Sequence, residues 1–251
     1  MATFDLQDYE AQYARHYTDA SFERVMVAVR RRRVLQSIGA AAGARVLEVG
    51  CGMEPVVAEL PRAATRTVVE PAAQFAEAAR RALAGQPGTA VFEAFFEDAV
   101  ESDAVAGQFD VIIVSSLLHE VAEPRRLLRA VRRVAADDAL VHVNVPNVRS
   151  LHRVLAVSMG LIDDVFEPSA TERRFQRHTR FDRDSLVAML RAEGFEVQST
   201  GSYFVKPFTH DQMQRALDAG VIDERVIRGL EAVTAQLPDL GAELYADVRP
   251  S

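Results

Sequence analysis

Cysteine, tryptophan and long apolar runs are scarce or missing in this chain of 251 residues. Cys51 is the only cysteine, which excludes an internal disulfide and a zinc site built on cysteines, and favours the cytoplasm. No apolar run approaches the roughly 18 to 20 residues of a membrane span, and the acidic stretch MATFDLQDYEAQ is unlike a signal peptide. Lysines are few and the formal net charge is −7, so no basic surface is available to nucleic acid. We therefore expect a soluble protein that binds neither membrane nor nucleic acid.

The length and the hydrophobic content of 49% allow a full core with a small additional cap. We expect a helical cap over residues 1–39 and one domain over 40–251, with helical insertions at about 148–180 and 204–240. The run Arg30–Arg33 falls in a helical pattern and is typical of a solvated face, with a homodimer surface as the alternative.

Short apolar runs alternate with helical stretches from Arg45 onward. The expected strands are RVLEVG, RTVVEP, TAVFEAFFED, FDVIIVSS, LVHVNVPN, FEVQSTGSYF and ELYADVR. Helices are expected from about Pro55, over AAQFAEAARRALAG, over EPRRLLRAVRRVAAD and from Asp184, with Asp182 as N-cap and Gly194 as the end of the last. Nearly continuous, β-branched strands that alternate with helices indicate a parallel sheet covered on both faces. The predicted fold class is therefore α/β and doubly wound.

A glycine turn, VLEVGCGMEP, ends the first expected strand. In an open α/β sheet the ligand lies at the carboxyl ends of the strands, and Gly50 and Gly52 let it approach the backbone closely. A dinucleotide loop has a third glycine where this chain has Pro55, and Glu54 would place a carboxylate where a pyrophosphate binds. These two residues disfavour a nicotinamide-dependent oxidoreductase. S-adenosylmethionine avoids the conflict, because it carries an adenosine and a cationic sulfonium but no phosphate.

The ordered motifs VLEVGCG, RTVVEP, FFED, FDVIIVSSLLHEV and LVHVNVPN span about residues 40–147. This order resembles the class I S-adenosylmethionine-dependent methyltransferases, especially the small-molecule enzymes related to the ubiquinone-type O-methyltransferases. The resemblance implies a mostly parallel sheet of seven strands, Rossmann-like, with an antiparallel closing strand, N-terminal helices and helical lids. It also implies S-adenosyl-L-methionine as cofactor, S-adenosylhomocysteine as product and a small-molecule substrate.

The same resemblance assigns the cofactor contacts. Glu70 would accept hydrogen bonds from both ribose hydroxyls, as a bidentate carboxylate can, and Ser115 would approach the sulfonium. Phe96 and Glu97 would frame the adenine, with Asp98 as the alternative to Glu97. The contacts around the methionine part, and from the N-terminal helix, would be Glu48, Gly50, Cys51, Gly52 and Tyr13.

Two of these residues also have a purely structural interpretation. Glu48 can cap the neighbouring helix, and Glu70, which precedes Pro71, can be an ordinary turn residue at a strand end. Cys51 is given no redox or nucleophilic role.

Methyl transfer is an in-line displacement at an activated carbon, so it needs alignment, exclusion of water, and a base only when the acceptor holds a proton. His119 in SSLLHEV is the candidate base, with Glu120 beside it; the alternative is a histidine that caps a helix or packs under the cofactor. No metal triad or serine nucleophile stands out, so no metal site is expected. The candidate contacts of the acceptor are Asn144, Asn147, His152 and His178.

The expected insertion after Asn147 is rich in charged residues. This favours a polar acceptor, such as a sugar, an aminosugar or another hydroxylated metabolite, over a quinone. The Ala- and Arg-rich composition is reminiscent of high-GC bacteria, which fits specialised metabolism such as antibiotic biosynthesis, or glycan modification. A non-catalytic protein that keeps the fold and binds a cofactor or a partner is the alternative from another class.

Overall fold

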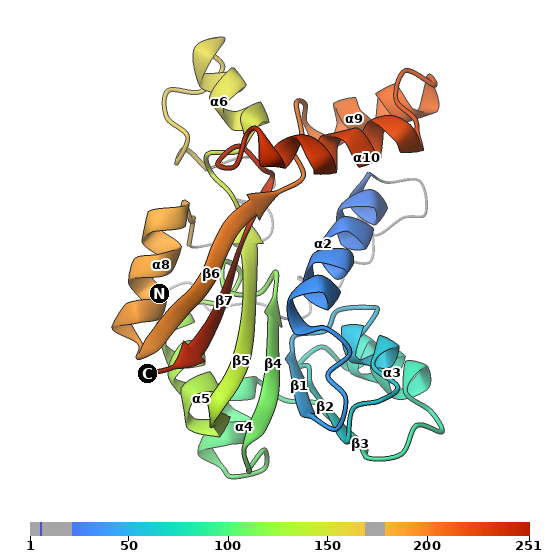
Figure 1. The fold of residues 1–251 in the computed structure, drawn as a ribbon, viewed down its shortest axis with the longest axis vertical. Coiled ribbons are helices and arrows are strands. Elements are labelled where there is room, and N and C mark those ends of the chain that lie inside the picture. The colour runs from blue at the N-terminus through green and yellow to red at the C-terminus, as the bar shows by residue number, and fades with distance from the viewer. Residues whose placement is uncertain (1–5, 7–21, 169–178) are drawn as a thin grey trace.

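The computed structural model describes Leu6 and residues 22–168 and 179–251, and it has a central sheet with helices on both faces (Figure 1). The sheet has seven strands in the order β3-β2-β1-β4-β5-β7-β6. Strands β1 to β5 pair in parallel, whereas β7 is antiparallel to both β5 and β6. The strands are β1 Arg45–Val49, β2 Thr65–Val69, β3 Thr89–Phe92, β4 Phe109–Ser115, β5 Ala135–Pro146, β6 Phe195–Tyr203 and β7 Glu243–Pro250. The predicted fold class is confirmed.

The helices of the described residues form two layers and a cap. Helices α4, α5 and α8 pack on one face of the sheet, and α2, the 3₁₀ helix η1 and α3 pack on the other. Helices α6, α9 and α10 lie beyond the carboxyl ends of the parallel strands (Figure 1). The bounds are α2 Glu23–Ile38, η1 Val56–Glu59, α3 Ala73–Ala82, α4 Phe96–Glu101, α5 Pro124–Val134, α6 Leu151–Ser158, α8 Arg183–Ala192, α9 His210–Asp218, α10 Glu224–Ala232 and η2 Val233–Ala235.

Local sequence signals explain where α8 begins and ends. The side chain of Asp182 accepts a hydrogen bond from the backbone N–H of Ser185 at 2.9 Å, and the Ser185 hydroxyl accepts one from the N–H of Asp182 at 3.0 Å. This reciprocal capping satisfies two amides that would otherwise lack partners. Gly194, at φ 82°, follows the helix in a conformation that favours glycine. Leu186 and Leu190 then face the core, each fully buried.

Two local predictions were wrong. The segment after Pro55 forms only one turn of 3₁₀ helix, because a β-branched pair starts it and Pro61 follows soon after its end. The stretch FFED begins helix α4 rather than ending a strand, and β3 stops at Phe92. Glu97 and Asp98 lie in the first turn of α4, where negative charge is favourable.

The expected solvated face at Arg30–Arg33 also needs correction, because these side chains bind other parts of the chain. Arg30 forms a bidentate pair with the carboxylate of Glu243, which is 4% exposed. The guanidinium of Arg33 lies 3.7 Å from the ring centroid of Tyr245. Arg31 and Arg32 pair with Glu59 and Glu231, respectively. These contacts attach helix α2 to strand β7, to η1 and to the cap helix α10.

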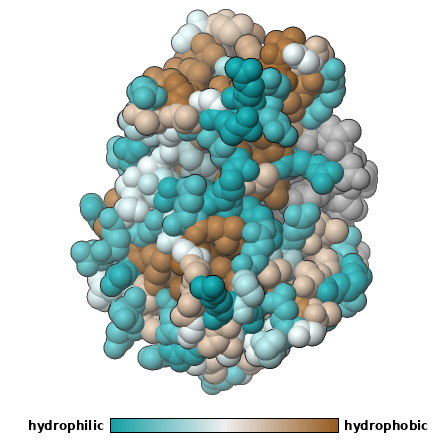
Figure 2. All heavy atoms as spheres, turned by 45° about the vertical axis from the view of Figure 1, so that its right-hand side comes forward, coloured by the Kyte–Doolittle hydropathy of each residue, from teal (hydrophilic) through white to brown (hydrophobic). Residues whose placement is uncertain are grey.

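The cap has a small apolar core of its own and some exposed apolar side chains. Phe22, Met26 and Val29 at the start of α2 pack against Phe204 and Met213. Brown, apolar areas gather at the top of Figure 2, over the cap helices. Among the described residues, no helix is both long and apolar enough to cross a membrane.

Candidate active site

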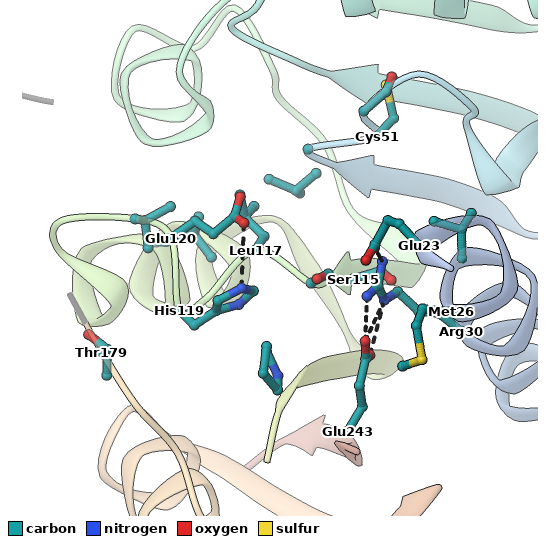
Figure 3. A pocket seen from close by; sticks show the side chains of 18 of the residues that line it. Glu23, Met26, Arg30, Cys51, Ser115, Leu117, His119, Glu120, Thr179 and Glu243 are labelled. Carbon is teal, nitrogen blue, oxygen red and sulfur yellow. Dashed lines mark hydrogen bonds and ion pairs between the residues drawn. The ribbon is translucent and has the colours of Figure 1, made fainter. Parts of the chain in front are cut away.

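A cavity of about 1080 Å³ lies at the carboxyl ends of the strands. Its walls come from the turn after β1, the ends of β2 and β4, the inner side of α2, and helices α6 and α9. Figure 3 shows side chains from α2, from the turn after β1 and from the end of β4 around it. The position is the one that the strand order predicts for a ligand, next to the point between β1 and β4 where the order reverses.

Glu48, in strand β1, connects the glycine turn after this strand to the start of η1. Gly50 and Gly52 have φ values of 69° and 57°, which side chains rarely tolerate. The buried carboxylate of Glu48 accepts hydrogen bonds from the amides of Val56 at 3.0 Å and Val57 at 2.9 Å. Glu48 therefore caps η1, as its structural interpretation predicted, and it also lines the cavity.

The hydrogen bonds from Val56 and Val57 to Glu48 distinguish a dinucleotide cofactor from S-adenosylmethionine. A dinucleotide-binding loop offers the amides at a helix N-terminus to a pyrophosphate. Here the amides of Val56 and Val57 are already bound by the carboxylate of Glu48. Glu54, the residue out of place in a dinucleotide loop, is 61% exposed and its carboxylate lies 4.0 Å from Arg31. The turn therefore repels a phosphate and suits a cofactor without one.

Glu70 joins the end of β2 to this turn. Its carboxylate accepts hydrogen bonds from the amides of Gly52 at 3.2 Å and Ala72 at 3.0 Å. Burial raises the pKa of Glu70 to about 7, against the lowering effect of these hydrogen bonds. Burial also raises the pKa of Glu48 to about 7. This end of the cavity thus holds two buried carboxyl groups, which in their ionised form favour a cationic ligand.

The predicted adenine residues lie at the first turn of α4. Phe96 and Glu97 both line the cavity. The Phe96 side chain is buried, and burial raises the pKa of the Glu97 carboxyl. Asp98 forms an ion pair with Arg126 at 2.8 Å, so its carboxylate is engaged. Cys51 also lines the cavity, and burial raises the pKa of its thiol, which makes it a poor nucleophile.

The end of β4 carries the predicted base. Ser115 and His119 both line the cavity, and His119 is 3% exposed. The Nε2 atom of His119 lies 3.5 Å from a carboxylate oxygen of Glu120 (Figure 3). Asn144 is fully buried and accepts a hydrogen bond from the Ser116 amide at 2.9 Å. Asn144 is absent from the cavity wall and positions the turn after β4 instead.

The other predicted acceptor residues divide into three cases. His152 lines the cavity from α6. Asn147 also reaches it, but its side-chain amide donates to the carbonyls of Asp239 and Gly241 at 3.0 and 2.8 Å. His178 lies outside the described residues, as does Tyr13, which was predicted as a cofactor contact.

Sequence reasoning missed several residues of the cavity wall. Arg30 and Glu243 meet there from α2 and the start of β7 (Figure 3). Behind them, outside the wall, Tyr203 donates to Glu243 at 2.7 Å. Lys206 follows β6, is 2% exposed and is the only lysine in the chain. Its uniqueness was readable from the sequence, but its burial was not. In the part of the chain that the structure describes, no three His, Cys, Asp or Glu side chains form a metal site.

Comparison with known protein families and structures identifies the family of this chain. Residues 15–200 match a family of methyltransferase domains. The chain belongs to this methyltransferase family. S-adenosylmethionine is accordingly its cofactor, and the acidic wall at Glu48 and Glu70, together with the glycine turn, fits a cationic ligand that has an adenosine and no phosphate. No protein with a curated function matches the chain.

Solved structures share the fold of this methyltransferase at low identity. The N-methyltransferase NodS from Bradyrhizobium japonicum WM9, in complex with S-adenosyl-L-homocysteine, has a TM-score of 0.61 at 12% identity, over 97% of this chain and 98% of NodS. A possible histamine N-methyltransferase from Thermotoga maritima has a TM-score of 0.59 at 15% identity, over 98% and 100% of the two chains. The [4+2]-cyclase SpnF has a TM-score of 0.58 at 18% identity, over 88% and 79%.

Proposed function

We propose that this methyltransferase transfers the methyl group of S-adenosylmethionine to an oxygen or a nitrogen of a polar small molecule. The observation that carries the proposal is one continuous cavity with an acidic end at Glu48 and Glu70 and a polar end at His152, Lys206 and Glu243. The first end suits a cationic cofactor, and the second gives a polar acceptor hydrogen-bonding partners.

At the acidic end, Glu70 is the proposed partner of the ribose hydroxyls. Its carboxylate already accepts from two backbone amides, and two oxygens have further lone pairs for two more donors. Gly50, Cys51 and Gly52 leave the turn without bulky side chains, so that the methionine part can pack against the backbone. Phe96 and Glu97 would frame the adenine from α4, and Ser115 would lie on the sulfonium side. Tyr13 stays a predicted contact.

His119 is the proposed general base. The cofactor supplies an activated methyl carbon, so the chain has to orient the acceptor, exclude water and remove a proton where the acceptor holds one. His119 lies in the turn that follows β4, at the wall of the cavity and almost without exposure to solvent. Glu120 stabilises the imidazolium that forms when Nε2 or Nδ1 takes the proton.

A polar acceptor, such as a sugar, an aminosugar or another hydroxylated metabolite, fits the far end of the cavity. Asn147, His152 and Arg153 contribute to this wall, and all three carry polar side chains. A role in specialised metabolism, including antibiotic biosynthesis, is part of the proposal, as is a homodimer. The relation to the ubiquinone-type enzymes stays a prediction.

Calorimetric titration with S-adenosylmethionine and S-adenosylhomocysteine, followed by a methyl-transfer screen, tests the proposal. We expect micromolar-class binding of both, lost in Glu70→Ala, and transfer of labelled methyl to hydroxylated or amino acceptors. The exposed Glu77→Ala is the matched control and should bind normally.

Binding without transfer to any acceptor class would favour a protein that uses the fold for another purpose, as the [4+2]-cyclase SpnF illustrates for this architecture. Binding of nicotinamide cofactors alone would refute the proposal.

A further inference from the structure

Lys206 is a buried cation at the wall of the cavity. It is the only lysine in the chain and its side chain is 2% exposed. Its Nζ lies 2.9 Å from Nδ1 of His210. No ion pair joins Lys206 to a carboxylate of residues 22–168 or 179–251. An ammonium group has three N–H donors, so two remain for a ligand after the contact with His210.

The neighbouring carboxylates are already matched by other groups. Glu243 is bound by Arg30 and Tyr203. Glu23 lies 3.6 Å from Arg30 and 3.2 Å from Nε2 of His210. These two carboxylates raise the pKa of Lys206, but burial has the larger effect and lowers it to about 8. A buried charge without a full counter-ion is costly, which makes an anionic ligand favourable.

His152 lines the same cavity and offers a second hydrogen-bonding group. Its Nδ1 atom is buried and has no hydrogen-bond partner among the described residues. Burial, followed by electrostatic effects of Lys206, His210 and Arg153, lowers the pKa of His152 to about 2. The imidazole is therefore neutral and adds a hydrogen-bonding group, but no charge, to the site.

The corner lies away from the predicted cofactor contacts. Lys206 follows β6, which is separated from β1 by β4, β7 and β5. Four interstrand spacings of about 4.8 Å place β6 roughly 19 Å from β1. Because β6 is parallel to β1, its carboxyl end reaches the same edge of the sheet and the same cavity.

We propose that Lys206 and His152 bind a carboxylate carried by the methyl acceptor. This inference rests on the proposed function and adds the class of acceptor. Lys206 supplies one positive charge, and the guanidinium of nearby Arg153 already donates to the carbonyls of Val165 and Glu167. One available ammonium matches a carboxylate better than a doubly charged phosphate. The two ends of the cavity then have opposite preferences, acidic at Glu48 and Glu70 and basic at Lys206. A carboxylate anchored at Lys206 directs the remainder of the acceptor toward His119 and the methyl group.

The single lysine allows a direct test on the intact protein. Protein labelled with ¹³C and ¹⁵N at lysine gives one side-chain ε signal, and its pH titration yields the pKa of Lys206. The titration is done in sodium chloride without and with S-adenosylhomocysteine at saturation. With S-adenosylhomocysteine present, it is repeated in sodium propionate and in sodium phosphate at equal ionic strength. We expect propionate at saturation to raise the pKa by about one unit relative to chloride, since an anion that binds the ammonium form about tenfold more tightly shifts it so far.

Two variants sharpen the test. His152→Phe removes one partner of the anion and should lower the propionate affinity at least threefold. Arg81→Gln removes a positive charge from an exposed site, 67% exposed, and should leave the effect of propionate unchanged.

Three results would overturn the proposal. Equal pKa values in propionate and chloride would exclude an anion site at Lys206. A full shift on addition of S-adenosylhomocysteine alone would assign the anion to the cofactor carboxylate. A larger shift in phosphate than in propionate would exclude the carboxylate class. Calorimetry of S-adenosylhomocysteine on the same samples separates these failures from failure of the proposed function, because only the latter abolishes cofactor binding.

Discussion

Glu70 accepts a hydrogen bond from the backbone amide of Gly52 at 3.2 Å, so the residue that follows β2 holds the turn that follows β1. The two segments are 18 residues apart in the chain and meet because β1 and β2 are parallel neighbours. One carboxylate therefore shapes the turn and faces the cavity.

The affinity for S-adenosylhomocysteine should depend on the ionisation of Glu70. Its pKa is raised to about 7, chiefly by burial, so the carboxyl is largely protonated at pH 6 and ionised at pH 8. Only the ionised form can accept from both ribose hydroxyls, so affinity should rise about tenfold between these pH values. Calorimetry across this range measures it, and Glu70→Gln is the control. The same pH dependence in wild type and variant would contradict the assignment.

Glu48→Ala should destabilise the fold by about 2 to 4 kcal/mol, because it leaves two buried amides without their charged acceptor. Urea unfolding at neutral pH measures the loss. The matched control is Glu54→Ala, at an exposed position of the same turn, which should cost less than about 0.5 kcal/mol. Comparable losses in the two variants would show that Glu48 does not cap η1.

Glu48 should also make the stability depend on pH. Its pKa is about 7 in the folded protein and near its ordinary value of 4.5 when unfolded. The folded state therefore binds more protons between these values, and the free energy of unfolding falls as pH rises from about 4.5 to about 7. Glu48→Gln should flatten this part of the stability curve. A curve identical to that of wild type would refute the raised pKa.

The pair of Arg30 and Glu243 should be strongly coupled. Either Arg30→Met or Glu243→Gln leaves a buried charge or polar group without its partner and should cost about 3 to 5 kcal/mol. The double variant should be more stable than the sum of the single effects predicts, by at least about 1 kcal/mol. The exposed pair of Arg32 and Glu231 is the control, and its loss should cost less than about 1 kcal/mol. Additive effects at Arg30 and Glu243 in urea unfolding would contradict the coupling.

His119→Asn should lower kcat for an acceptor that must lose a proton by about 10²- to 10⁴-fold, the usual contribution of a general base. The affinity for S-adenosylhomocysteine should change less than about threefold, because His119 is not a proposed cofactor contact. Single-turnover kinetics with the identified acceptor measure the chemical step. An unchanged rate, or a loss of cofactor binding in parallel with activity, would place His119 in a packing role.

Local signals explain which parts of the fold could be predicted from the sequence. The strands were recognisable because buried parallel strands are nearly continuous apolar runs, and Asp182 marks a helix start through its own side chain. The stretch FFED was misassigned because two phenylalanines suit a strand, whereas the acidic residues that follow favour the first turn of a helix.

The elements that surround the cavity were largely predictable, whereas contacts between distant segments of its wall were not. Gly50 and Gly52 belong to one short motif, and Glu70 directly follows the next strand along the chain, which pairs directly with β1. Arg30 and Glu243 are 213 residues apart, and no local pattern connects them. Lys206 stands out in composition, but its place in the cavity depends on strand order, which brings β6 to the same edge as β1.

The position of β7 in the sheet has a consequence for the order in which the enzyme is assembled. Strand β7 is the last in the chain and lies between β5 and β6. During synthesis, β6 therefore has no neighbouring strand to pair with until Glu243–Pro250 has emerged from the ribosome. The parallel strands β1 to β4, which lead to the proposed cofactor contacts, have all their partners much earlier. A nascent chain can thus fold the proposed cofactor end of the cavity well before the proposed acceptor end. The cofactor can then bind and stabilise the nascent chain before the acceptor end has formed.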